Sequence, residues 1–307
     1  MTQKIGIIGG SGLYKIEQFE VVETDKQFQK AQETIYGSPS APIKKYKMKG
    51  VDAELYFLAR HGENHHLNPS EVPYRANILA LKQLGVDWIL SISAVGSLQE
   101  EIAPRDMVVI DQFIDRTKGR PSTFFHDGIV AHISFGDPVC AKLRQYLLQS
   151  AQEVAQEVAE KNNSGADDTE RDNFTVHDGG TYVCMEGPAF STRAESNMYR
   201  SFGASVIGMT NLPEAKLARE AEISYATLAM STDYDCWNID HGEVSVDEVV
   251  ANMNANIMNA KDILLKVIPT IAEHEGDVPF KDTIAGSIIS KVTPPNRKYD
   301  LKSILGK

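Results

Sequence analysis

The sequence has few cysteines, no long apolar run and fewer basic than acidic residues. Its three cysteines, Cys140, Cys184 and Cys236, lie far apart and form no Cys-x-x-Cys pair, which is typical of a protein in a reducing, cytoplasmic setting. No apolar run approaches the roughly 18 residues of a membrane helix, and the amino terminus lacks the core and cleavage site of a signal peptide. These absences predict a soluble, unexported protein with no membrane partner.

The charge balance excludes a further class of partner. The 42 acidic and 31 basic residues give a formal net charge of −11, which repels the phosphates of nucleic acids and of anionic lipids. We therefore expect neither nucleic acid nor a membrane surface as a partner. The 307 residues suffice for one large core or two modest ones, so length alone leaves the number of domains open.

Short β-branched runs alternate with stretches of helical spacing, which predicts an α/β fold. The expected strands span residues 4–8, 51–59, 88–94, 107–110, 205–209 and 224–230. Helices are expected at 75–84 and 142–160, and after the capping-box pairs Thr192 with Glu195 and Ser245 with Glu248. The polar composition of residues 161–178 indicates an exposed insertion. The residues from about 273 onward are expected to form an appendage that packs on the rest of this subunit or on a neighbouring subunit.

A glycine-rich turn follows the first expected strand. In Gly9-Gly10-Ser11-Gly12 the permissive backbone lets amides close around an anion, and the Ser11 hydroxyl adds a donor. The turn lacks the third glycine of the dinucleotide pattern, which argues against a dehydrogenase, and it lacks the Gly-Lys-Ser/Thr of the Walker pattern. A tight strand-to-helix turn without a ligand fits the same residues.

Arg60 and His61 follow a second expected strand, at the position where α/β sheets commonly place ligands. The planar fork of Arg60 suits phosphate oxygens, and His61 and His65 offer proton donors or acceptors. Histidines four residues apart also fit a zinc site, but no third ligand pattern accompanies them, and a surface role for His65 fits equally well. Small and hydroxyl residues at 91–98 follow a third strand, where a ligand or a packed helix could approach.

Seven ordered sequence blocks resemble those of the methylthioadenosine phosphorylase family over residues 4–268. The blocks are GGSGL at 9–13, LARHG at 58–62, YRAN at 74–77, AVGSL at 94–98, DQFIDRT at 111–117, MEGP at 185–188 and TDYDCW at 232–237. The resemblance implies one nucleoside phosphorylase-like domain over residues 1–307, with a central mixed β-sheet flanked by helices, assembled as a homotrimer. It implies cleavage of 5′-methylthioadenosine to adenine and 5-methylthioribose-1-phosphate, with inorganic phosphate as co-substrate and no metal or organic cofactor.

The resemblance also implies roles for individual residues. It places the phosphate against Ser11, Arg60, His61, Ser93, Ala94 and Thr210. It places Met209 at the ribose, Phe190 near the base, and Asp233 and Asp235 where they read the purine. It implies an apolar pocket for the methylthio group, formed by Val244, Val246 and Val249, although an ordinary helix core explains these three valines as well. It also implies that His132 reaches into the nucleoside pocket of the adjacent subunit.

Asp233 and Asp235 have the chemistry that a 6-amino purine requires. Adenine presents an amino group at C6 and an acceptor at N7, so its site needs one acceptor and one proton donor. Two carboxyls in one pocket repel each other as anions, and burial beside Tyr234 and Trp237 favours keeping one of them protonated. Alternation along a strand would place residues 233 and 235 on the same side. A lone Asp-x-Asp also fits a solvated turn or a calcium ligand.

The sequence departs from the pattern of animal members of the family at four positions. Ser11 and Ser93 replace threonines and keep their hydroxyls, Pro73 replaces an asparagine, and Gly208 replaces an asparagine before Met209. We expect Gly208 to loosen nucleoside selectivity because it removes a side chain beside the ribose. Two rival functions stay open: a phosphorylase for inosine, guanosine or methylthioinosine, which would want an amide donor facing O6, and a non-catalytic purine-binding protein.

Overall fold

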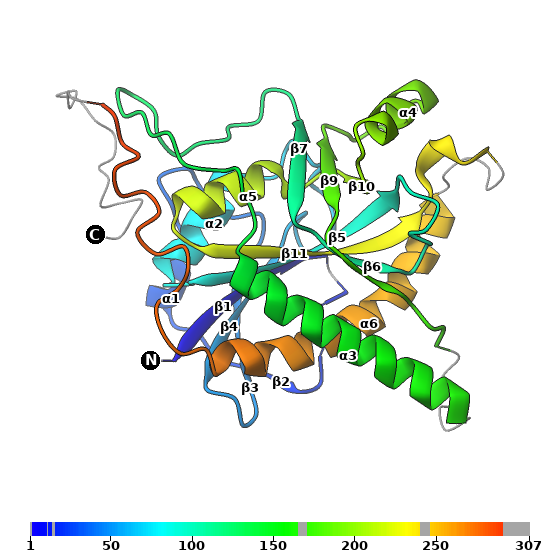
Figure 1. The fold of residues 1–307 in the computed structure, drawn as a ribbon. Helices are drawn as coiled ribbons and strands as arrows, with labels where there is room; N and C mark the ends of the chain where they lie inside the picture. Colours follow the sequence, from blue (N-terminus) through cyan, green and yellow to red (C-terminus); the bar gives the residue numbers. More distant parts are fainter. Residues whose placement is uncertain (1, 11, 14–15, 165–170, 240–245, 291–307) are drawn as a thin grey trace.

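The computed structural model describes residues 2–10, 12–13, 16–164, 171–239 and 246–290, and a mixed β-sheet with helices on both faces forms its centre (Figure 1). The strands are β1 (Gln3–Gly9), β2 (Phe19–Val21), β3 (Lys44–Met48), β4 (Ala53–Ala59), β5 (Trp88–Ser97), β6 (Met107–Val109), β7 (Gln112–Arg116), β8 (Val176–Asp178), β9 (Thr181–Met185), β10 (Val206–Gly208) and β11 (Ser224–Asp233). The helices are α1 (Lys26–Lys30), α2 (Tyr74–Gln83), α3 (Ala141–Ser164), α4 (Arg193–Ser201), α5 (Asn211–Glu220) and α6 (Val246–Ala272), with the short 3-10 helix η1 (Asp235–Trp237).

Parallel pairing at the centre of the sheet brings four strand ends to one edge. Strand β5 pairs in parallel with β1 and β11, and β1 pairs in parallel with β4, whereas β10 runs antiparallel to β5. The register places Gly9 opposite Ala59, so β1 and β4 end together. In open α/β sheets, ligands bind beyond the carboxyl ends of such strands. The loops after β1, β4, β5 and β11 therefore frame the candidate site.

Helices cover both faces of the sheet because its central strands are apolar on both sides. Along β4, Leu55 and Phe57 belong to one hydrophobic cluster, whereas Tyr56 and Leu58 belong to the other, as alternation along a strand requires. Helices α3 and α6 lie side by side against the first cluster, and α2 and α5 pack on the second (Figure 1). The α/β class and the mixed sheet expected from the sequence are what the structure has.

The local signals of the sequence agree with the structure at most of these elements. All six expected strands and the helices expected at 75–84 and 142–160 are present, with ends that differ by a few residues. The capping box before α4 is formed in both directions, between Thr192 and Glu195. The second expected box involves Ser245, which lies outside the described residues.

The polar segment at 161–178 is less of a loop than the sequence predicts. Helix α3 continues to Ser164, and the last three residues of the segment form strand β8. Phe174 is buried in the cluster under α3 and α6. Arg171 donates from Nε to Asn259 Oδ1 at 2.6 Å and from Nη1 to Asp262 Oδ2 at 2.7 Å, which ties the segment to α6. The expected exposed loop is therefore wrong at both of its ends, because tertiary contacts override a polar composition.

The chain after α6 returns along the body of the protein. Ile284 is buried in the cluster around α2 and α5, and two backbone hydrogen bonds follow, from His132 N to Ser287 O at 2.9 Å and from Ile289 N to Val130 O at 3.0 Å. These contacts bind residues 284–289 to the long connection between β7 and α3. No described helix is both long and apolar enough to cross a membrane.

Glu220, the last residue of α5, is a buried carboxyl that holds the loop after β7. Its Oε1 accepts a hydrogen bond from Thr123 Oγ1 and its Oε2 accepts one from Phe124 N, both at 2.7 Å. Burial raises the pKa of Glu220 from 4.5 to about 7. Because the folded-state pKa exceeds the unfolded one, this proton stabilises the fold fully below pH 4.5, and the stabilisation is lost as the pH rises through about 7.

We expect Glu220→Gln to remove this contribution to pH dependence. The gap in unfolding free energy between parent and variant should change by about 3 kcal/mol between pH 4.5 and pH 8, with the parent losing stability relative to the variant as the pH rises. Urea unfolding of both proteins at matched pH values measures the gap. If the difference in unfolding free energy between the two proteins stayed constant over this pH range, the raised pKa of Glu220 would be contradicted.

Candidate active site

Four segments converge at the carboxyl edge of the sheet. Arg60 N donates to Gly9 O at 3.1 Å, which joins the ends of β1 and β4. Ser93 Oγ lies 3.2 Å from Tyr182 Oη, and Thr210 N lies 3.5 Å from the same oxygen, which joins β5 to the turn before α5. Thr210 is the N-cap residue of α5, and its side chain makes no capping hydrogen bond to the helix. The structure thus brings together Ser93 and Thr210, two residues that are distant in sequence and were both expected to bind phosphate.

Arg60 lies deeper than the sequence predicts. Its Nε and Nη2 donate to the two carboxylate oxygens of Glu214, at 2.8 and 3.0 Å, and both side chains are almost completely buried. Burial opposes the charged form, but Glu214 outweighs burial and raises the pKa of Arg60 above its usual value. The planar fork that we expected to face phosphate is therefore occupied by Glu214.

Most of the remaining N–H groups of Arg60 already donate hydrogen bonds within the protein. Nη2 lies 2.7 Å from Ser91 Oγ, and Nη1 donates to Ile92 O at 3.1 Å. A guanidinium has five N–H groups, and the second hydrogen of Nη1 is the one that these bonds leave for an anion. Glu214 thus fixes the guanidinium, and only its Nη1 end can serve a phosphate.

His61 is neutral at pH 7 in this arrangement. Burial, together with the charge of Arg60, lowers the pKa of His61 to about 4. Its Nδ1 lies 2.9 Å from Leu67 O, and because a carbonyl only accepts, Nδ1 carries the hydrogen. Nε2 is then an acceptor, so its partner on a ligand has to be a hydrogen-bond donor, such as a hydroxyl. The exposed His65 ring stacks on His61 with centroids 4.4 Å apart.

Asp233 and Asp235 are both buried at the end of β11. Asp233 Oδ1 accepts from Asp235 N at 2.8 Å, and Asp233 Oδ2 lies 2.7 Å from Thr232 Oγ1. Gly96 on β5 makes room for this carboxylate, because a Cβ at position 96 would lie 2.8 Å from Asp233 Oδ1. Burial raises the pKa of Asp235, which the nearby Ser196 hydroxyl only partly opposes. The pair therefore combines a carboxylate that accepts hydrogen bonds with a second carboxyl whose pKa is raised by burial.

The two aspartates come together by a different route from the one expected. Strand β11 ends at Asp233, and Asp235 opens the 3-10 helix η1 with a left-handed φ of 48°. The prediction that strand alternation places both carboxyls on one side is therefore wrong. A tight turn instead brings the backbone amide of Asp235 to the Asp233 carboxylate, and the Asp235 carboxyl has the Ser196 side chain as its partner.

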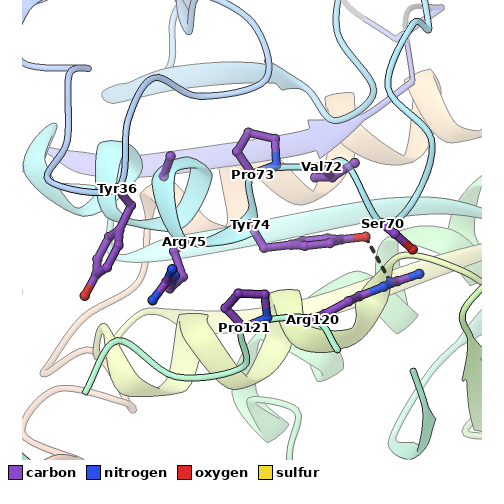
Figure 2. A pocket seen from close by; sticks show the side chains of 9 residues that line it. Tyr36, Ser70, Val72, Pro73, Tyr74, Arg75, Arg120 and Pro121 are labelled. Atoms are coloured by element: carbon purple, nitrogen blue, oxygen red, sulfur yellow. Dashed lines mark hydrogen bonds between the residues drawn. The ribbon is translucent and has the colours of Figure 1, made fainter. Parts of the chain in front are cut away.

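Arg120 joins the loop after β9 to the turn before α5, and sequence reasoning missed it. Its Nη1 donates to Met209 O at 2.6 Å and to Leu212 O at 3.0 Å, and its Nη2 donates to Glu186 O at 2.5 Å. Nη1 also lies 3.2 Å from Tyr74 Oη, the contact drawn as a dashed line in Figure 2. Met209, expected at the ribose, is thus held through its carbonyl by a buried guanidinium.

The pocket beside Arg120 is too small for a nucleoside. Figure 2 shows Tyr74 and Pro121 between Arg120 and the pair Arg75 and Tyr36. The pocket encloses about 120 Å³, below the ~300–1,000 Å³ of small-molecule sites. The Arg75 guanidinium lies 4.3 Å from the centroid of the Tyr36 ring. We therefore assign no substrate to this pocket and treat Arg120 as support for the neighbouring loops.

Arg120→Lys is expected to lower kcat/KM for the nucleoside by about 10- to 100-fold. The single ammonium keeps the charge but cannot reach the carbonyls of Met209, Leu212 and Glu186 together, so the ribose-side turn loses its fixed position. Steady-state kinetics with either substrate varied measures the loss. Arg75→Lys is the matched control, since Arg75 lines the same pocket but contacts Tyr36. Equal kinetics in both variants would refute a positioning role for Arg120.

The remaining expected nucleoside residues are placed less completely. Phe190 is 48% exposed, and its loop is joined to the aspartate turn by the bond from Cys236 Sγ to Ser191 O at 3.2 Å. Val249 is half-buried on α6, and His132 is exposed in the connection between β7 and α3. Ser11, Val244 and the side chain of Val246 lie outside what the structure describes, so their roles stay predictions.

Neither a disulfide nor a cluster of metal ligands is seen in the described part of the chain. Cys140, Cys184 and Cys236 are all free thiols. Among the described residues, no group of three or more histidine, cysteine, aspartate or glutamate side chains is arranged to hold a metal ion.

Comparisons with known proteins agree on one family. The family model described as the phosphorylase superfamily matches residues 4–269. The S-methyl-5′-thioadenosine phosphorylase of Thermosynechococcus vestitus is 54% identical over 274 residues, which are 89% of this chain and 87% of that protein. The protein of the same name from Geobacter sulfurreducens is 49% identical over 309 residues, covering 100% of this chain and 99% of its own.

Solved structures share the fold. The crystal structure of a methylthioadenosine phosphorylase from an antarctic soil metagenomic library matches with a TM-score of 0.81 at 44% identity, over 95% of this chain and 94% of that chain. The Schistosoma mansoni methylthioadenosine phosphorylase in complex with adenine matches with a TM-score of 0.75 at 36% identity, over 92% and 95% of the two chains. The family and fold expected from the seven blocks are confirmed.

Proposed function

This chain belongs to the phosphorylase superfamily, and we propose that it cleaves 5′-methylthioadenosine with inorganic phosphate to adenine and 5-methylthioribose-1-phosphate. One observation carries the choice of purine: Asp233 and Asp235 are 8% and 6% exposed and lie in contact at the carboxyl edge of the sheet. An acceptor beside a protonated carboxyl complements the amino group and N7 of adenine.

The aspartate pair acts on the leaving group. Glycosyl transfer passes through an oxocarbenium-like state in which the departing purine gains negative charge. A carboxyl that stays protonated near neutral pH gives N7 a proton as the bond breaks, while the other carboxylate accepts from the amino group. Burial raises the pKa of Asp235, which is the direction that a proton donor in this role requires.

The phosphate cluster positions the nucleophile. We infer that Ser93, Ala94, Thr210 and the Nη1 end of Arg60 hold the phosphate. In support, Ser93 and Thr210 both contact the Tyr182 hydroxyl, Arg60 Nη1 donates to Ile92 O next to Ser93, and Gly96 on the same strand contacts Asp233. Holding phosphate in line saves positional entropy and requires no covalent step on the protein. Neutral His61 accepts a hydrogen bond from a phosphate or ribose hydroxyl at Nε2. Purified protein should therefore turn over without any cofactor, and should keep its activity in EDTA.

Base release tests the reaction directly. The purified protein is incubated with 5′-methylthioadenosine, adenosine or inosine, each with and without inorganic phosphate. We expect adenine release that requires phosphate and is fastest from 5′-methylthioadenosine. Preferential cleavage of inosine would favour the 6-oxopurine phosphorylase, and binding without base release from any nucleoside would favour the non-catalytic purine-binding protein.

Assembly and compartment form a further part of the proposal. We propose a cytoplasmic homotrimer in which His132 of one subunit reaches the nucleoside pocket of the next. The half-exposed Phe190 and the free thiols are compatible with this setting. Light scattering at working concentration should give three times the 33.9 kDa chain mass. A monomer that is fully active would contradict the shared pocket.

A further inference from the structure

The space beside Gly208 is filled by a buried tyrosine. A Cβ built at position 208 would lie 1.9 Å from the Tyr182 hydroxyl oxygen and 2.5 Å from its ring carbon Cζ. Tyr182 is fully buried, and its ring meets Phe113 edge-on with centroids 5.8 Å apart. We expected Gly208 to leave a vacancy beside the ribose, but Tyr182 from β9 occupies that space.

The Tyr182 hydroxyl lies between two expected phosphate ligands. It is 3.2 Å from Ser93 Oγ and 3.5 Å from Thr210 N. A backbone amide only donates and Ala94 O only accepts, so the arrangement that uses all three contacts runs from Thr210 N to the tyrosine oxygen, from the tyrosine hydroxyl to Ser93 Oγ and from Ser93 Oγ to Ala94 O. The hydrogen of Ser93 is thereby directed away from Tyr182, where Ala94 O lies at a long 3.3 Å. A phosphate oxygen can replace that weak contact.

We propose that Tyr182 is a positioning residue of the phosphate site, which orients the Ser93 hydroxyl as a donor and fixes its distance from the Thr210 turn. This inference rests on the proposed function, which assigns Ser93 and Thr210 to phosphate. Gly208 leaves the space that the Tyr182 hydroxyl occupies, since any side chain at position 208 would displace that hydroxyl. Tyr182 acts through these two neighbours and on the nucleophile rather than on the purine.

The electrostatic state of Tyr182 fits this role. Burial raises the pKa of the Tyr182 phenol to about 12, so the hydroxyl keeps its hydrogen throughout the neutral range. A phenolate here would repel the phosphate, whereas a neutral hydroxyl relays a hydrogen bond to Ser93 without adding charge. The phosphate dependence of turnover should therefore show no titration of Tyr182 near neutral pH.

Tyr182→Phe tests the inference with the smallest possible change. The ring and its contacts with Gly208 and Phe113 remain, and only the hydroxyl is lost. We expect KM for phosphate to rise about five- to tenfold, while kcat and KM for the nucleoside stay within twofold. Tyr56→Phe is the matched control, because it removes a buried tyrosine's hydrogen bond to Glu54, at 2.7 Å on β4, and should leave both KM values unchanged.

A double-variant cycle separates positioning from packing. If Tyr182 acts through Ser93, then Tyr182→Phe should raise KM for phosphate little further in a Ser93→Ala background. An unchanged KM for phosphate in Tyr182→Phe, or equal effects on both substrates, would overturn the inference. If the parent protein shows no phosphate-dependent base release at all, the proposed function fails instead, and that is established before any variant is compared.

Discussion

Asp233→Ala is expected to lower kcat for phosphorolysis of 5′-methylthioadenosine by about 10²–10⁴-fold, the usual contribution of a positioned acid or base. Asp233 is buried with Asp235 where the purine is proposed to lie, and we propose that the pair shares the roles of acceptor and proton donor. The proposed phosphate residues lie on β5 and the α5 turn, so KM for phosphate should change by no more than a few-fold. Steady-state kinetics with each substrate varied measures both quantities.

Controls distinguish lost chemistry from lost structure. Asp106 is equally buried, at 7% exposure, but accepts from Thr175 N and Ala103 N and lies within 2.9 Å of His177 Nε2, so Asp106→Asn should lower Tm and leave kcat nearly unchanged. Asp233→Asn keeps an acceptor for the bond from Asp235 N. This variant should still lose turnover of the 6-amino nucleoside. Its activity on inosine relative to that nucleoside should rise, because the new side-chain amide can donate a hydrogen bond to O6 of inosine. Near-normal kcat in Asp233→Ala would refute the assignment.

The fold was largely predictable because its central strands carry strong local signals. The runs that became β1, β4, β5 and β11 are apolar over most of their length, and Thr192 with Glu195 marks the start of α4. The strands that were not expected, β2, β3, β7, β8 and β9, are only three to five residues long, which leaves little room for a clear alternating pattern. Residues 161–178 were misjudged because Arg171 and Phe174 are held by α6 and its neighbouring core, which composition does not reveal.

The site could be predicted from the sequence only where the residues next to a functional residue in the chain indicate its role. Asp233 lies in a motif block at the end of β11, and Ser93 and Thr210 lie in or just after the runs expected as strands at 88–94 and 205–209; the structure joins Ser93 and Thr210 through the Tyr182 hydroxyl. Tyr182 and Glu214 were missed because they act on partners 89 and 154 residues away, Ser93 and Arg60. No spacing rule connects residues so far apart. The same cause explains the error at Arg60, whose fork was expected to face phosphate and instead meets Glu214.

Glu214→Gln is expected to lower the free energy of unfolding by about 3–5 kcal/mol, the typical cost of removing one partner of a buried ion pair. The Arg60 and Glu214 side chains are 3% and 1% exposed, so the Arg60 charge would remain buried without a counter-ion. Tyr225 Oη also donates to Glu214 Oε1, at 2.9 Å, and would lose a charged acceptor. Urea unfolding at a fixed protein concentration measures the loss, because the stability of an oligomer depends on concentration.

The exposed pair Lys44 and Glu63 supplies the control for this measurement. Their side chains are 44% and 50% exposed, so Glu63→Gln should produce no measurable change in unfolding. The double variant Arg60→Met with Glu214→Leu should recover part of the lost stability, because apolar residues of similar volume remove the uncompensated charge. It should not recover phosphate-dependent turnover, since the Nη1 donor is gone. If stability and turnover returned together, Arg60 would have no role at the phosphate, and its ion pair would serve the fold alone.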